Sequence, residues 1–144
     1  MNVAAILAKK GKGVVTIHPD QTLREGVALL AKHKIGALVV VDQAGQVVGI
    51  LSERDITRAL AEDEQIFSQP VSTLMTPKPI TGVPQDDLLV VANTMTEKRF
   101  RHLPIVDKGR LIGIVSIGDV VKAQRDQYSG EVDTLHAQIL ATEV

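Results

Sequence analysis

The feature that most constrains the fold is a phrase that the chain contains twice. Residues 49–56 read GILSERDI and residues 113–120 read GIVSIGDV, so each copy has Gly-Ile-x-Ser-x-x-Asp followed by an aliphatic residue. Residues 16–56 align with residues 81–120 once a single residue is deleted. Identical pairs lie along the whole alignment: Thr16/Thr81, Pro19/Pro84, Leu23/Leu88, Leu38/Leu103, Asp42/Asp107, Gly49/Gly113, Ser52/Ser116 and Asp55/Asp119. Such a repeat predicts two copies of one structural unit.

Each copy predicts the same order of elements, which is strand, helix, strand, strand, helix. The short strands are expected at 14–17 and 79–82, and β-hairpins with polar, glycine-containing turns are expected at 37–51 and 103–115. Apolar residues at helical spacing follow each short strand: Leu23, Val27 and Leu30 in the first copy, and Leu88, Ala92 and Met95 in the second. Thr22 with Glu25 forms a capping box ahead of the first of these helices.

We therefore expect an α/β (α+β) fold in which two β-α-β-β-α repeats pack through their sheets about a pseudo-twofold axis. A unit of about 60 residues buries only a modest core by itself, which favours this pairing over two independent domains. The expected boundaries are a first repeat with a leading helix at 3–62, a linker at 63–70, a second repeat at 71–125 and a C-terminal helical tail at 126–144. Gly130 is expected to interrupt the tail helix.

Composition excludes several classes of protein. The chain has no cysteine, so disulfides, thiolate metal sites and thiol nucleophiles are excluded. A formal net charge of −1 argues against nucleic acid as a partner. No apolar stretch approaches the roughly 18 residues of a membrane span, and no signal peptide is evident at the start, so we expect a cytoplasmic protein without membrane contact.

The repeated Ser-x-x-Asp supports two interpretations. It is first a capping box at a helix start, in which the serine accepts a hydrogen bond from a backbone amide of the first turn. It is also a place where a carboxylate can accept two hydrogen bonds from a ribose diol, as acids do in dinucleotide-binding folds. Because a capping box does not require the preceding Gly-Ile, the residues leave both interpretations open.

The duplicated motif resembles tandem cystathionine-β-synthase (CBS) domains, also called the Bateman module. The phrases that carry the resemblance occur in order along residues 3 to 125: SERDI (52–56), LMTP (74–77), RHLPIVD (101–107) and SIGDV (116–120). The resemblance implies a regulatory module that binds AMP, ADP, ATP or NAD(H) in clefts between the copies, signals to a separate protein and forms a homodimer through its helices. It implies no catalytic cofactor.

Carried onto this sequence, the resemblance implies one strong site built on Asp119. Ser116 and Asp119 would hold the ribose, and Ile80, Thr81, Leu103 and Pro104 would surround the base. The small Gly118 would leave room beside the aspartate, and its neighbour Ile117 would also belong to the site. The phosphate would meet Arg99, Arg101 and His102, with Arg54 reaching across from the first copy. A second, weaker cleft would contain Thr16, Ile17, Gly36, Ala37, Leu38, Ser52 and Asp55.

The residues show no arrangement typical of an enzyme. His18, His33, His102 and His136 form no metal-binding pair, so we expect no metal site. Neither a P-loop, a Rossmann glycine motif nor a G-x-S-x-G elbow occurs, so we expect binding without catalysis. The alternative is a degenerate CBS pair that serves as a dimerisation scaffold and binds no nucleotide.

Overall fold

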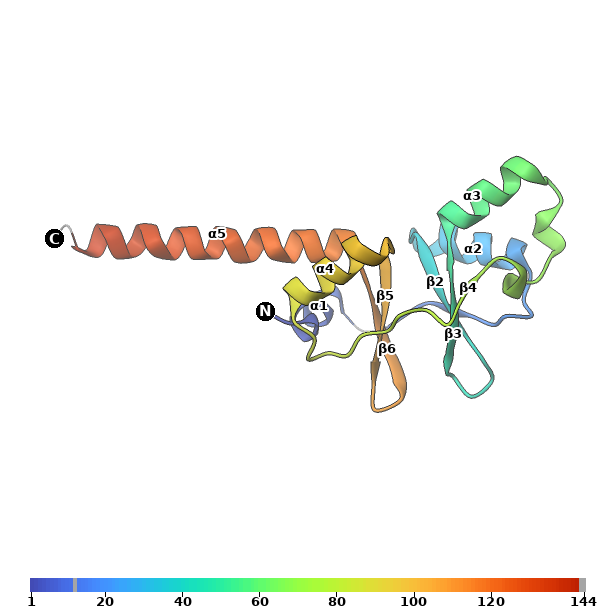
Figure 1. Cartoon of the computed structure of the whole chain (residues 1–144), viewed down its shortest axis with the longest axis horizontal. Helices are drawn as coiled ribbons and strands as arrows, with labels where there is room; N and C mark the ends of the chain where they lie inside the picture. The colour runs from blue at the N-terminus through green and yellow to red at the C-terminus, as the bar shows by residue number, and fades with distance from the viewer. Residues whose placement is uncertain (12, 143–144) are drawn as a thin grey trace.

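The computed structural model describes residues 1–11 and 13–142, and its two halves follow the repeat (Figure 1). The first half contains β1 (Thr16–Ile17), α2 (Leu23–His33), β2 (Ala37–Val41), β3 (Val47–Ser52) and α3 (Glu53–Glu62). The second contains α4 (Leu88–Lys98), β5 (His102–Asp107), β6 (Arg110–Ser116) and α5 (Ile117–Thr142). The predicted order is confirmed in the first half, and the antiparallel hairpin is confirmed in both halves. The strand predicted at 79–82 is reduced to a single parallel bridge between Gly82 and Ile105.

Each half has its own aliphatic core. In the first half, Leu23 and Leu30 of α2 are buried against the strands, and in the second half Leu88 and Met95 of α4 are buried in the same way. Thr22 Oγ1 accepts a hydrogen bond from the backbone amide of Glu25 at 3.2 Å, which confirms the predicted cap of α2. The apolar faces read from the sequence therefore point into the cores, because that is where their burial stabilises the fold.

Two segments cross from one half to the other. Helix α1 (Val3–Lys10) precedes the first half in sequence, but Val3 and Ile6 are buried in the core of the second. Strand β4 (Thr76–Pro77) lies between the halves in sequence and pairs antiparallel with β3, which makes a sheet of order β1-β2-β3-β4. Residues 63–70, expected as a linker, include the 3₁₀ helix Ile66–Ser68, and Ile66 is buried in the first core.

The glycine of each repeated phrase lies under a crossing segment. A Cβ placed on Gly49 would lie 2.6 Å from Met75 Sδ and 3.0 Å from the Thr76 carbonyl oxygen. A Cβ placed on Gly113 would lie 2.7 Å from Leu7 Cδ2. Both distances are too short for ordinary packing, so the repeated glycine lets a crossing segment lie directly on the hairpin.

Helix α5 is longer than the sequence suggested. It runs unbroken from Ile117 to Thr142, so the expectation that Gly130 interrupts it is wrong. A mid-helix glycine costs only about 1 kcal/mol relative to alanine, which the continuing backbone hydrogen bonds tolerate. Residues 143 and 144 of the predicted tail lie outside the described residues. Among the residues described, none of the helices is apolar enough over sufficient length to cross a membrane.

Candidate functional site

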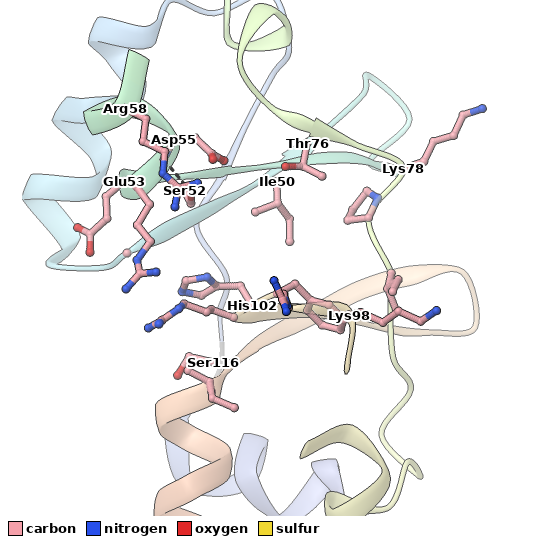
Figure 2. Close-up of a pocket in the computed structure, with 18 residues that line it drawn as sticks. Ile50, Ser52, Glu53, Asp55, Arg58, Thr76, Lys78, Lys98, His102 and Ser116 are labelled. Atoms are coloured by element: carbon pink, nitrogen blue, oxygen red, sulfur yellow. Dashed lines mark hydrogen bonds between the residues drawn. The ribbon is translucent and has the colours of Figure 1, made fainter. Parts of the chain in front are cut away.

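A cavity of about 720 Å³ lies between the two halves (Figure 2). This volume falls within the usual range for small-molecule sites. Ile50, Ser52 and Thr76 lie on the side of the first half, and His102 and Ser116 lie on the facing side. The walls therefore come from both copies of the repeat, together with the crossing segment that follows β4. The complete lining is Gly36, Ile50, Ser52, Glu53, Arg54, Asp55, Arg58, Thr76, Lys78, Pro79, Ile80, Lys98, Arg99, Phe100, Arg101, His102, Ser116 and Ile117.

The first-copy Ser-x-x-Asp opens onto this cavity at the start of α3. Ser52 is the N-cap, and its Oγ accepts a hydrogen bond from the backbone amide of Asp55 at 3.2 Å. The carboxylate of Asp55 has no hydrogen bond or ion pair with any other residue in the described ranges 1–11 and 13–142. A half-buried carboxylate beside a helix N-terminus can accept hydrogen bonds from a ligand's hydroxyl groups.

Six arginine and lysine side chains line the cavity, against two carboxylates. The cations are Arg54, Arg58, Lys78, Lys98, Arg99 and Arg101, and the carboxylates are Glu53 and Asp55. Within the described part of the chain, the salt bridges join Lys10 to Asp119 and Arg125 to Asp126, so none of the six cations is paired with an acid. An excess of unpaired arginine and lysine around one cavity favours an anionic ligand, and arginine forks suit phosphate in particular.

Backbone geometry brings the second copy's cations to the cavity. Arg99 ends α4 as a left-handed C-cap with φ 59° and ψ 43°, which turns the chain into β5. Two residues later, the carbonyl of Arg101 accepts a hydrogen bond from the Ile117 amide at 2.8 Å. This bond fixes the start of β5 against the start of α5, and so places the basic segment 98–102 at the mouth between the halves.

The second Ser-x-x-Asp is arranged differently, because its aspartate already has partners. Asp119 Oδ2 accepts a hydrogen bond from the Ser116 amide at 2.9 Å, and Ser116 Oγ accepts one from the Asp119 amide at 3.0 Å. Lys10 Nζ lies 2.8 Å from the same Oδ2 and also donates to the Ile114 carbonyl at 2.9 Å. The capping-box contacts are therefore present in this copy, and a lysine from α1 also pairs with Oδ2 of the aspartate.

The two titrating groups near this point have shifted pKa values. Burial raises the pKa of the Asp119 carboxyl, but hydrogen bonds from Lys10 and from the Ser116 amide lower it more, so its net pKa lies below the usual value. Burial is the largest cause that lowers the pKa of His102, and the charge of Lys10 adds to it. The nearby carboxylates Glu53 and Asp119 oppose this shift only in part. The neutral imidazole is therefore favoured in the free protein.

The cavity gathers many, but not all, of the residues expected from the sequence. Those that line it are Ser116, Ile80, Arg99, Arg101, His102, Arg54, Ile117, Gly36, Ser52 and Asp55. Those that do not line it are Asp119, Thr81, Leu103, Pro104, Gly118, Thr16, Ile17, Ala37 and Leu38. Leu103 and Leu38, for example, are buried in the two cores instead. The cavity thus combines the first copy's aspartate with the second copy's basic segment.

Sequence reasoning missed several lining residues. Thr76, Lys78 and Pro79 enter because β4 pairs with β3, and Arg58 enters because it follows Arg54 by one turn of α3. The four-residue spacing of the two arginines was visible in the sequence, whereas the strand pairing was not. No cluster of three potential metal-ligating side chains occurs within residues 1–11 and 13–142.

Comparisons with known proteins agree with this architecture. The CBS domain family model matches twice, at residues 8–62 and 71–126. The crystal structure of the CBS-domain protein ATU1752 from Agrobacterium tumefaciens has a TM-score of 0.82 and 42% identity, covering 86% of this chain and 99% of that one. The protein PAE2072 from Pyrobaculum aerophilum, complexed with AMP, has a TM-score of 0.75 and 30% identity, covering 83% and 89%.

A third solved structure holds other adenosine compounds. The CBS pair of protein MJ0100, in complex with 5-methylthioadenosine and S-adenosyl-L-methionine, has a TM-score of 0.78 and 30% identity, covering 88% of this chain and 98% of that one. The solved CBS pairs that resemble this chain thus include complexes with AMP, S-adenosyl-L-methionine and 5-methylthioadenosine. With two matched copies that span most of its length, the chain belongs to the CBS domain family as a tandem pair.

Proposed function

We propose that the protein is a regulatory module that binds an adenine nucleotide, AMP, ADP, ATP or NAD(H), and passes that signal to a partner protein. The observation that carries the proposal is a cavity lined by Asp55 and by six cations, none of which has an acidic partner within residues 1–11 and 13–142. A nucleotide has both features that such a site recognises, which are an anionic phosphate and a vicinal diol.

In the proposed complex, Asp55 and Ser52 hold the ribose. The base lies against the apolar side chains of Ile50 and Ile80, which both line the cavity. The phosphate lies toward Arg54, Arg99 and Arg101. The second cleft, at Asp119, is the weaker one in this proposal, because a ligand there must first displace the ammonium group of Lys10.

The cavity's charge also distinguishes between the ligands of the related structures. S-adenosylmethionine carries a positive sulfonium group, whereas AMP carries only negative charge outside the base. Six lining cations repel the first and attract the second. We therefore expect AMP to bind more tightly than S-adenosylmethionine, and adenosine to bind more weakly than AMP.

A thermal-shift screen tests the proposal. A ligand at about one hundred times its Kd adds roughly 2.7 kcal/mol of stability, which for a chain of this size is roughly 5–10 °C in Tm. Arg54→Ala should lose most of the AMP shift while keeping its fold. Arg110→Ala is the matched control, because Arg110 is exposed at the start of β6 and does not line the cavity. No shift with any of these nucleotides would support the dimerisation scaffold instead.

We also propose that the protein is cytoplasmic and acts as a homodimer. Leu89 and Val90 of α4 are each 60% exposed, beside the buried Leu88 and Val91, so the outer face of this helix is more apolar than the sequence spacing suggested.

A further inference from the structure

Helix α5 has two parts with different surroundings. Its first turns contact α4, β6 and α1, and Val120 is fully buried in the core of the second half. The rest of the helix extends away from the body (Figure 1). From Arg125 to Ala141 every described side chain is exposed except Val132, which is half-buried.

The extended part carries an apolar stripe with a seven-residue repeat. Val121, Tyr128 and Leu135 follow one another at intervals of seven and are 56%, 69% and 57% exposed. Val132 lies between Tyr128 and Leu135 on the same side, and Ile139 continues the spacing. Alternating steps of four and three residues are the a and d positions of a coiled coil, with Tyr128 and Leu135 at d and Val132 at a.

Such a helix lacks the packing that normally stabilises one. Most helical stability in proteins comes from burying an apolar face rather than from helix propensity. Gly130 adds a local cost of about 1 kcal/mol at its centre. Gly130 occupies the outermost position of the heptad, where no side chain is needed for packing, so the stripe itself is uninterrupted.

We propose that the stripe of α5 forms a parallel two-stranded coiled coil with α5 of a second copy of this chain. The spacing is self-complementary, because the same d and a residues meet in each layer of a parallel pair. In this arrangement Glu131, at a g position, meets His136, at an e position, of the second copy. An antiparallel pair that keeps the apolar layers together sets the two Glu131 side chains against each other.

One core residue and the mixed charge of the helix favour a second copy over other partners. Arg125 occupies one a position, and a single polar a residue favours a dimer in one register at a cost in stability. Residues 122–141 carry Lys122 and Arg125 against Asp126, Glu131 and Asp133, so this segment lacks the cationic face that attracts helices to anionic lipid. The inference goes beyond nucleotide binding, since none of these residues lines the cavity.

Analytical ultracentrifugation of the full chain tests the proposal. The wild-type chain should dimerise, and Leu135→Glu should raise the dimer dissociation constant at least tenfold. Ala137→Glu, on the outer face of the same helix, should dimerise like the wild type. A monomeric wild type, or a Leu135→Glu variant that dimerises unchanged, overturns the proposal. So does a dimer that Leu89→Glu alone dissociates, because α4 would then be the interface.

The chain has no cysteine, which allows a direct test of orientation. Leu135→Cys should cross-link to itself under mild oxidation, since d residues face each other in a parallel pair. Cross-linking only in a mixture of Leu135→Cys with Arg125→Cys would show the antiparallel pair and overturn the parallel arrangement. AMP thermal shifts measured on the same samples report nucleotide binding separately, so failure of one proposal is not mistaken for failure of the other.

Discussion

Replacing Asp55 and Asp119 in turn with alanine should separate binding from stability. Asp55 lines the cavity, and its carboxylate has no partner among the described residues. In Asp55→Ala the Ser52 cap remains, so the unfolding free energy should change by less than about 0.5 kcal/mol. Hydrogen bonds to a charged group contribute roughly 1.5–3 kcal/mol, so AMP affinity should fall roughly 10- to 150-fold.

The effect of Asp119→Ala should be the reverse. This change removes the acceptor of the Ser116 amide and the ion pair with Lys10, both of which lie within 2.9 Å. Losing a helix-capping contact costs about 1 kcal/mol, and a partly exposed ion pair adds a few tenths more. Stability should therefore fall by about 1–2 kcal/mol, while AMP affinity for the cavity stays within about threefold of the wild type.

Calorimetric titration with AMP and urea unfolding on the same two variants provide the measurements. If Asp119→Ala abolishes AMP binding while Asp55→Ala leaves it intact, the main site is the second cleft and the assignment of the cavity is wrong. If both variants lose stability equally, the Asp55 carboxylate has a structural partner that contradicts the geometry described above.

Three further predictions follow from the same contacts. The lowered pKa of Asp119 contributes stability that is present above the usual carboxyl pKa of about 3.9 and is lost as pH falls through the folded value, so Lys10→Met should flatten the acid side of a plot of Tm against pH. The lowered pKa of His102 contributes stability that is present above pH of about 6.5 and is lost at lower pH. The Tm of His102→Gln should therefore fall less than that of the wild type between pH 7.5 and 5.5. An equal fall in Tm would contradict the burial of the neutral imidazole. Gly49→Ala should lower the unfolding free energy measured in urea by about 1–3 kcal/mol, because the added Cβ would meet Met75 and Thr76. Gly118→Ala should leave stability unchanged or raise it slightly, because its Cβ would meet only Ser116 Oγ, at 3.6 Å. Equal effects of the two changes would refute the close-approach explanation.

The repeat made the local structure predictable. Thr22, Ser52 and Ser116 were recognisable as helix caps because capping depends on residues only three positions apart. The crossing of α1 and β4 between the halves was not predictable, because the sequence shows that a short segment is apolar but not which sheet it joins. The continuity of α5 was not predicted, because a glycine lowers helix propensity but does not by itself end a helix.

The candidate site was likewise predictable only where it depends on residues that are close together in the sequence. The basic segment 98–102 and both aspartates could be identified from the sequence, but their distribution between clefts could not. Lys10 lies 109 positions before Asp119 in the chain, so the contact that occupies the second aspartate leaves no local signal. Asp55 and Asp119 are equivalent in the alignment and differ only in their three-dimensional partners. Asp119 is paired with Lys10, whereas the Asp55 carboxylate has no partner within residues 1–11 and 13–142.

The most direct test of the central claim is isothermal titration calorimetry of the unmodified chain with AMP, with adenosine as the matched ligand without phosphate. The six cations that line the cavity with Asp55 predict one strong AMP site per chain, with AMP bound at least tenfold more tightly than adenosine and more weakly as salt concentration rises. No detectable AMP binding, or equal affinity for AMP and adenosine, would contradict the account.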